Sequence, residues 1–190
     1  MKIALMMTAA AFSLSACLGN GGGEVLSDSE IAKLAPTKDM PTGSASYSGS
    51  FESETIGSGF SYVATADLAL NANFDASTVS ASLSNFGVTQ VEGDNTVVGT
   101  ATGKMTGDGL ITGSAFVAQV DGILTVSSLT LNGEEVDAVA DQAVGDKLDE
   151  FATVAGQFVG EDAAGIYGQE VEEFESVGVT TTVTIVGNKD

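Results

Sequence analysis

Strict alternation of apolar and polar residues is the feature of this sequence that most constrains its fold. Between residues 62 and 74, every second position is apolar: Tyr62, Ala64, Ala66, Leu68, Leu70, Ala72 and Phe74. Polar residues such as Asp67 and Asn71 stand between them. Successive side chains of a β-strand point to opposite faces of a sheet, so the pattern predicts a long strand with one buried face.

The same period of two returns along the chain from Ser44 onward. It predicts further strands over residues 79–84, 96–105, 110–120, 123–131 and 177–186. Short turn signals separate these segments, at Gly93-Asp94-Asn95, Gly107-Asp108-Gly109, Asp121-Gly122 and Asn132-Gly133. Asp-Gly and Asn-Gly between alternating runs are strong hairpin signals. The order therefore predicts an antiparallel meander.

About eight strands of this kind close into an up-and-down β-barrel, which removes the exposed edges of an open sheet. Small residues at alternate positions suit the tight bending of a small barrel, and here they are Gly99, Ala101, Gly103, Gly113 and Ala115. We therefore expect an all-β chain, an antiparallel up-and-down barrel preceded by a short N-terminal helix and a flexible tether.

Residues 136–151 depart from the period of two. Their apolar residues recur at helical spacing: Val136, Val139, Ala140, Ala143, Val144, Leu148 and Phe151. A helix containing Gly145 is one interpretation. A distorted strand preceded by an acidic loop is the other, and the pattern alone leaves both open.

The N-terminus carries a targeting signal. Lys2 precedes an apolar stretch, residues 3–14, that is too short to span the roughly 30 Å of a bilayer core as a helix. The only cysteine follows at Cys17, in the run Leu14-Ser15-Ala16-Cys17. That run resembles the lipobox of bacterial lipoproteins. The resemblance implies a signal peptide over residues 1–16, cleavage between Ala16 and Cys17, and lipid attachment to Cys17.

Residues 17–43 are expected to link this anchor to the barrel. A Gly-rich stretch follows the cysteine, and such stretches form flexible tethers. Ser27 and Glu30 have the spacing of a capping box, Leu26 and Ile31 that of a hydrophobic staple, and Pro36 ends the predicted helix. No Asp follows Cys17, so the inner-membrane retention signal of many lipoproteins is missing, and delivery to the outer membrane is expected.

Composition excludes several classes of function. The net charge is −20, and all six basic residues are lysine. Nucleic-acid binding needs clustered Lys and Arg, so no nucleic-acid partner is expected. With no His, and with the one Cys in the targeting segment, neither a Ser–His nor a Cys–His pair can form. We expect no enzymatic activity and no cofactor.

Three groups of residues are candidate binding sites. Asp94, Asn95 and Asp108 carry oxygen ligands of the kind Ca²⁺ prefers, but Asp and Asn are also ordinary turn residues. Acidic clusters that could attract a basic protein lie at Glu134, Glu135, Glu170, Glu172, Glu173 and Glu175. A haem ligand would need an axial Tyr or Met, from Tyr47, Tyr62, Tyr167, Met40 or Met105.

A motif near the C-terminus resembles the barrel domains of transferrin-binding protein B. The residues that carry it are Gly156, Phe158, Gly160, Ala163, Ala164, Gly165 and Gly168. The earlier glycines Gly99, Gly103, Gly107 and Gly113 resemble that family's upstream hairpins. The resemblance covers residues 44–190, a single barrel, whereas the full-length family members have two lobes. The extended loops that grip transferrin are not evident.

The resemblance implies a surface lipoprotein whose barrel binds a ligand: a protein, or an iron or haem source for uptake. An outer-membrane transporter is the partner that such a role implies. The alternatives are a structural envelope or surface-coat lipoprotein without a specific ligand, and a carrier that holds a small ligand inside the barrel.

Overall fold

Eight long antiparallel strands make up most of the computed structural model, which describes residues 26–139 and 141–190. They are β1 (Ser44–Gly57), β2 (Phe60–Asn73), β3 (Thr78–Glu92), β4 (Asn95–Thr112), β5 (Ala115–Leu131), β9 (Lys147–Val159), β10 (Gly165–Phe174) and β11 (Val179–Lys189). Three two-residue strands lie between β5 and β9, namely β6 (Glu134–Glu135), β7 (Ala138–Val139) and β8 (Gln142–Ala143).

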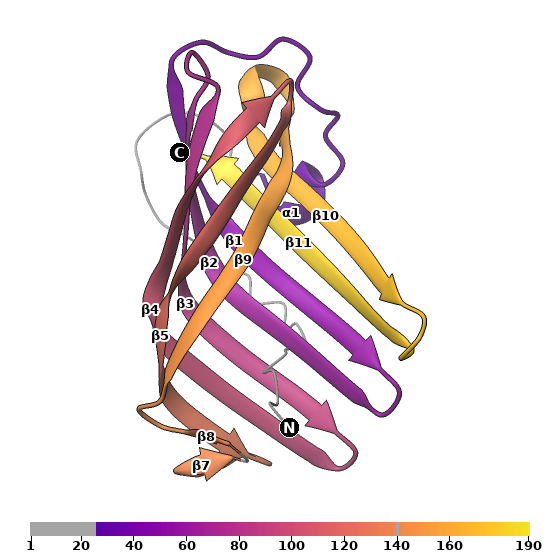
Figure 1. Ribbon diagram of the computed structural model, residues 1–190. Coiled ribbons are helices and arrows are strands. Elements are labelled where there is room, and N and C mark those ends of the chain that lie inside the picture. Colours follow the sequence, from indigo (N-terminus) through magenta and orange to yellow (C-terminus); the bar gives the residue numbers. More distant parts are fainter. Residues whose placement is uncertain (1–25, 140) are drawn as a thin grey trace.

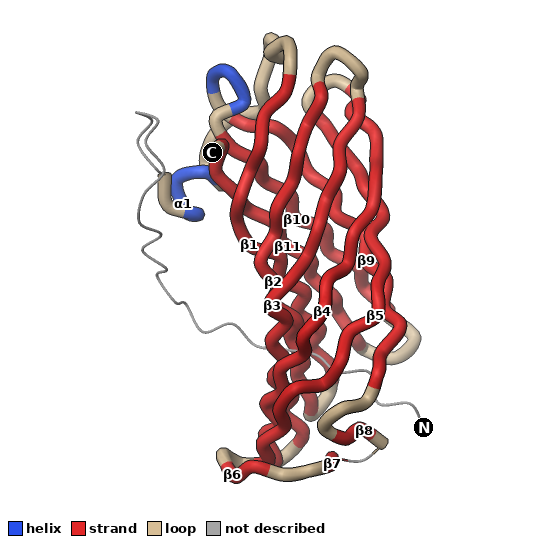
Figure 2. Tube along the Cα trace, turned by 90° about the vertical axis from the view of Figure 1, so that its left-hand side faces the viewer, coloured by secondary structure: helices blue, strands red, loops and turns tan. Residues whose placement is uncertain are grey.

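The long strands form a closed ring. Each pairs with the next long strand in the sequence, and β11 pairs back onto β1 over residues 180–189. The strands run up and down along the molecule with short turns at the two ends (Figures 1 and 2). The predicted up-and-down barrel of about eight strands is therefore confirmed.

The core follows the alternation that predicted the strands. Leu68, Leu70 and Ala72 of β2 are buried, whereas Asp67 and Asn71 between them are exposed. Aromatic rings meet at the centre around Phe158, which is 0% exposed. Its ring centroid lies 5.5 Å from that of Tyr47, 5.2 Å from that of Phe74 and 5.1 Å from that of Phe116. Tilted and edge-on contacts at these distances are favourable for aromatic rings.

Two of the predicted turns are wrong. Gly107-Asp108-Gly109 lies inside β4, and Asp121-Gly122 lies inside β5, so each of these strands runs straight through a predicted break. A Cβ atom at Gly107 would overlap the carbonyl oxygen of Gln119 on the neighbouring strand. These glycines are needed because two strands approach closely there, a use of glycine that has the same sequence appearance as a turn.

The turn between β4 and β5 occurs at Gly113 and Ser114 instead, where Gly113 has a φ of +59°. Gly113 was expected to help bend a strand, and this expectation is also wrong. The Asn132-Gly133 turn is confirmed. Both residues have positive φ, 53° and 86°, as the tight hairpin turn favoured by Asn-Gly requires.

The described residues of the 136–151 segment, which are all of them except Ala140, contain no helix. They form β7, β8 and the start of β9, so the interpretation as a distorted strand after an acidic loop is the correct one. The apolar residues at helical spacing serve a different purpose. Val136, Val139 and Leu148 pack on a small buried cluster made by Val97, Val126 and Leu129 at one end of β4 and β5.

The predicted N-terminal helix is present as one turn, α1 (Asp28–Ile31). The Glu30 carboxylate accepts hydrogen bonds from the Ser27 backbone N–H (2.9 Å) and hydroxyl (2.6 Å), which confirms the capping box. Buried Ile31 packs against Val159 and Val186 on the outside of the barrel, with Leu26 beside it. No helix in the described ranges is long and apolar enough to cross a membrane. Cys17, Ala16 and the expected signal peptide lie outside the described residues.

Candidate functional site at the seam between β9 and β10

The barrel is closed by a short contact between β9 and β10. Only three residue pairs join these strands, Val159 with Gly165, Phe158 with Ile166 and Gln157 with Tyr167. The closing contact coincides with the motif noted in the sequence. A Cβ atom on Gly168 would overlap the carbonyl oxygen of Ala155, and one on Gly156 would lie 2.8 Å from that of Tyr167. The two glycines let the strands cross in contact, and beyond them the strands separate.

Within residues 26–139 and 141–190, the separation leaves two strand edges without a partner strand. Residues 147–154 of β9 pair only with β5, and residues 169–174 of β10 pair only with β11. Figure 1 shows β9 running down to one side while β10 and β11 run down to the other. We call these two edges, residues 147–154 and 169–174, the seam. The opposite end of the barrel, where β9 and β10 pair, is called the closed end.

The hydrogen-bonding direction of β10 follows from its neighbour. Lys189 N–H donates to the carbonyl of Ala164, and these two residues are opposite each other in the register of β10 and β11. In an antiparallel ladder, hydrogen-bonded and non-bonded pairs alternate. The even-numbered residues of β10 therefore bond to β11. The amide and carbonyl groups of Gln169, Val171 and Glu173 point toward the seam.

The same reasoning applies to β9. Phe158 N–H donates to the carbonyl of Ser114, and Val126 N–H to that of Asp146, which are both even-numbered pairs of the β5–β9 register. The even-numbered residues of β9 therefore bond to β5, and the backbone groups of Asp149, Phe151 and Thr153 point toward the seam. An unpaired edge of this kind is a template for pairing with another strand.

Acidic side chains line the inner face of the seam. Glu150 lies between Leu148 and Ala152, whose partners across the ladder are the buried residues Leu124 and Val120. On the other edge, Glu170 is opposite Val183, which packs against the core. Glu172 is two residues further on, so it has the same facing. Three carboxylates therefore take core-facing positions where the alternation would place apolar residues.

The outer face of the seam carries two exposed apolar side chains among polar and charged ones. Phe151 of β9 is 86% exposed, and Val171 of β10 is 54% exposed. Phe174, at the end of β10, has the same facing as Glu170 and Glu172, and it is exposed, as is Val177 in the turn that follows. Large exposed apolar side chains add contact area for a partner that lies along a strand edge.

Burial raises the pKa of the Glu150 carboxyl, and the neighbouring charge of Asp149 raises it further. Burial also raises the pKa of Tyr62, and the nearby Glu150 carboxylate adds to that increase. A partly desolvated carboxylate among other acids gains stability from any cation placed beside it.

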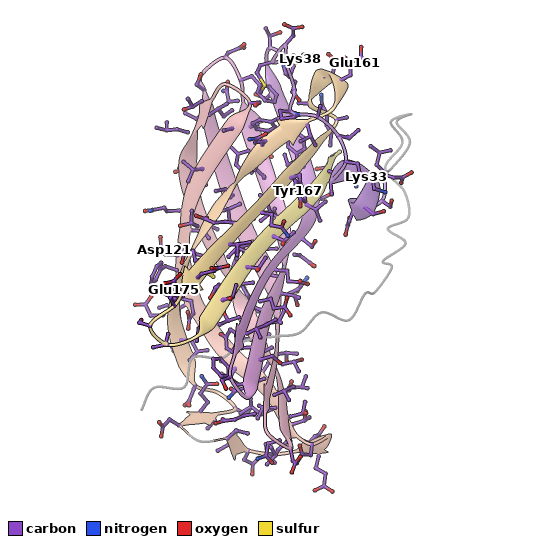
Figure 3. The ribbon with its side chains drawn as sticks, turned by 90° about the vertical axis from the view of Figure 1, so that its right-hand side faces the viewer. Lys33, Lys38, Asp121, Glu161, Tyr167 and Glu175 are labelled. Carbon is purple, nitrogen blue, oxygen red and sulfur yellow. The ribbon has the colours of Figure 1, made fainter. Side chains whose placement is uncertain are left out.

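Positive charge is concentrated away from the seam. Lys33 and Lys38 lie toward the closed end together with Glu161, while Glu175 lies at the tip of the β10–β11 hairpin (Figure 3). Lys189 also lies at the closed end, where its ammonium donates to the carbonyl of Asp162 (2.9 Å). Among the described lysines, Lys147 alone lies on the seam. Three of the five described lysines, Lys33, Lys38 and Lys189, therefore lie toward the closed end.

The structure separates the residues proposed as haem ligands. Tyr47 is buried, and its hydroxyl donates to the carbonyl of Ala163 (3.0 Å). Met105 is buried in the core, and Met40 packs against it. Tyr167 packs against the Ile31 cluster on the outside of the barrel, whereas Tyr62 faces inward. These side chains do not converge on one cavity.

The residues proposed for Ca²⁺ are also apart. Asp94 lies in the turn between β3 and β4 and Asn95 begins β4, whereas Asp108 lies further along β4 opposite Ser80. No group of three or more acidic side chains within the described ranges is arranged to hold a metal ion. Of the predicted acidic clusters, Glu134 and Glu135 form β6, and the cluster of residues 170–175 contributes to the seam and the hairpin tip.

One hollow of about 610 Å³ crosses the outer faces of β1 to β4. Its walls are small polar residues in register, among them Ser46, Asn71, Ser80 and Asp108. The Ser46 hydroxyl donates to the side-chain oxygen of Asn71 (2.8 Å). Because neither an aromatic ring nor a cation lies in this hollow, it offers a ligand less than the seam does.

Sequence reasoning identified the acids of β10 but missed Glu150, Phe151 and Val171. A signal for them existed. Glu150, Glu170 and Glu172 stand at the apolar phase of their strands, and a carboxylate at such a position indicates a face that is not fully covered. That two particular strand edges stay unpaired could not be seen in the sequence.

No protein-family model matches the chain, and no curated protein matches it. Among solved structures, a mutant transferrin-binding protein B from Haemophilus parasuis has a TM-score of 0.43 and 20% identity, covering 79% of this chain and 27% of that one. The transferrin-binding protein B of Neisseria meningitidis has a TM-score of 0.42 and 15% identity, covering 78% and 26%.

The N-lobe of lactoferrin-binding protein B from Moraxella bovis has a TM-score of 0.38 and 16% identity, covering 80% of this chain and 61% of that one. The chain thus spans about a quarter of the two transferrin-binding proteins. These are proteins of the kind that the sequence motif resembles. With TM-scores below 0.5, the likeness adds nothing to the fold that the strand ladders establish.

Proposed function

We propose that this protein is a lipid-anchored binding protein of the bacterial outer membrane that captures a protein partner at the seam. The observation that carries the proposal is the seam itself. It combines unpaired backbone groups, exposed Phe151 and Val171, and the acidic side chains of Glu150, Glu170 and Glu172. Free strand edges that carry exposed apolar side chains and several carboxylates are suited to a protein ligand.

The anchor belongs to the same proposal. Lipid attached to Cys17 would hold the barrel at the membrane, with the Gly-rich stretch as a tether, and more than one acyl chain is needed for stable anchoring. Replacing Cys17 by Ser should release the protein from the membrane fraction of cells. If the Cys17→Ser protein remains in that fraction after a carbonate wash, the anchor is wrong.

The capture role is tested with the full-length, lipidated protein on living cells. A photo-crosslinking amino acid is placed at Phe151, on the seam, or at Ser82, a matched control on the outer face of β3. Transferrin and lactoferrin, named in the solved structures above, are the first proteins to offer, each labelled with a fluorophore. An outer-membrane transporter is the second partner to look for among the crosslinked products.

We expect one discrete crosslinked product from position 151 and none from position 82. Equal crosslinking at both positions, or none at position 151 with any protein offered or present in the envelope, would overturn capture at the seam. The second outcome would favour a structural envelope role.

A further inference from the structure

The two edges of the seam offer a regular set of backbone groups. On β10, the backbone amides and carbonyls that point toward the seam belong to Gln169, Val171 and Glu173. On β9 they belong to Asp149, Phe151 and Thr153. Each set repeats every second residue, which is the spacing at which an added strand places its own amides and carbonyls. In most barrels these groups would pair with each other, but here the strands separate after Gly156 and Gly168.

The side chains beside the edges differ between the two faces. The inner face presents Glu170 and Glu172 on β10 and Glu150 on β9, and the outer face of β10 presents Gln169, Val171 and Glu173. A strand added along β10 would alternate its own side chains between these faces. Basic residues at every second position would meet the carboxylates of Glu170 and Glu172, and an apolar residue between them would cover Val171.

The same charges argue against a second copy of this chain as the occupant. Two chains of net charge −20 would bring identical carboxylates together at a shared edge. Like charges directly opposite each other destabilise a strand pair, and charged residues on strand edges commonly prevent self-association. The carboxylates thus repel a second copy of this chain and attract a cationic strand.

We infer that the free edge of β10 at the seam binds an extended polypeptide segment with basic residues at alternate positions, which adds to β10 as a further strand. This inference rests on the proposed capture function and names the partner's chemistry and its mode of binding. Backbone hydrogen bonds along the edge supply affinity, and the acidic inner face selects the basic side chains.

The test uses the full-length lipidated protein in detergent micelles and a fluorescent peptide of about twelve residues that alternates lysine and valine. Two further peptides carry N-methyl groups, one on the lysine amides and the other on the valine amides. N-methylation removes amide donors while keeping every charge. A fourth peptide replaces lysine by glutamate. Binding is measured by fluorescence anisotropy at fixed ionic strength.

We expect the lysine–valine peptide to bind and the glutamate peptide not to bind. At least one N-methylated peptide should bind about tenfold more weakly, because it loses several ladder hydrogen bonds. If both N-methylated peptides bind as tightly as the parent, the attraction is purely electrostatic and strand addition is wrong. Absence of binding by the parent peptide would overturn it as well.

Variants of the protein locate the site. Val171→Pro removes an amide that faces the seam without removing one that bonds to β11, and Val171→Thr keeps that amide as a matched control. We expect binding to fall about tenfold in the proline variant only. Equal affinities for both variants would contradict the inference.

In case the proline variant unfolds, hydrogen exchange of the wild-type protein gives a second measurement. The bound peptide should protect the amides of Gln169, Val171 and Glu173, and protection elsewhere only would contradict the inference. Crosslinking of a natural partner at position 151 without peptide protection would leave capture standing and strand addition refuted. Peptide protection without any crosslinked partner would leave strand addition standing and refute capture of a natural partner.

Discussion

The two halves of β9 have opposite surroundings. Its C-terminal half, around Phe158, is paired on both edges and packed between aromatic rings. Its N-terminal half, around Phe151, is paired on one edge only and exposes its phenylalanine to solvent. One strand thus has a phenylalanine in the core, Phe158, and another on an exposed surface, Phe151. The two rings also point to opposite faces of the strand, because the residues are an odd number of positions apart, so Phe158 faces the core and Phe151 faces outward.

The comparison predicts very different costs for truncating the two phenylalanines. Phe158→Ala should reduce the free energy of unfolding by about 3–5 kcal/mol, because it removes a buried ring and leaves a cavity. Phe151→Ala should change it by less than about 0.5 kcal/mol. Urea denaturation of the two variants beside the wild type measures both values. Similar losses would mean that Phe151 is covered in the free protein.

The point at which the strands part can be moved by one side chain. Gly168→Val should destabilise the barrel by about 1–3 kcal/mol, because its side chain would collide with the backbone of Ala155. Amide protection at residues 157 and 159 should fall, as the closing ladder opens further. Hydrogen exchange and thermal unfolding check this.

Gln169→Val, the same new side chain one position along on the exposed part of β10, is the control and should have little effect on either measurement. If Gly168→Val behaved like this control, close approach would not be the reason for the glycine.

The smallest expected effect is on the pH dependence of stability. Burial, with help from neighbouring Glu54, raises the pKa of the Glu52 carboxyl, as burial and Asp149 do for Glu150. A carboxyl whose pKa is raised on folding contributes stability that is present below its unfolded pKa and is lost as pH rises through the folded pKa. The free energy of unfolding should therefore increase as pH is lowered from neutral toward the ordinary carboxyl range.

Glu30, whose pKa is lowered by its hydrogen bonds to Ser27, acts in the opposite sense, but only at lower pH. The double variant Glu52→Gln and Glu150→Gln should show a smaller increase between pH 7 and mildly acidic pH, which chemical denaturation at each pH would measure. An unchanged increase in the double variant would assign the effect to the general acidity of the chain.

Several features were predictable because they depend on nearest neighbours in the chain. The alternation around Leu68 and Leu70 marks a strand with one buried face, and Ser27 with Glu30 marks a helix start. The Asn132-Gly133 pair marks a turn, because few residue pairs adopt two positive φ values. Strands joined by short turns then restrict the topology to a meander, and about eight such strands close the meander into a barrel.

Other features depend on what lies across the sheet. Gly107 and Gly113 look alike in the sequence, yet one permits a close approach to Gln119 and the other forms a turn. The apolar residues from Val136 to Leu148 keep helical spacing but cover the end of two strands. In both cases the neighbour that decides is distant in the chain.

The alternation of side chains along each strand therefore determined, by itself, that this chain forms a meander of strands with one buried face, because facing is a local property of extended backbone. Only the tertiary structure decided that Gly156 and Gly168 cross in contact and that the strands then part. Pairing between two edges depends on where strand twist and packing bring them. For that reason the sequence alone does not reveal the seam, with Glu150 on one edge and Val171 on the other.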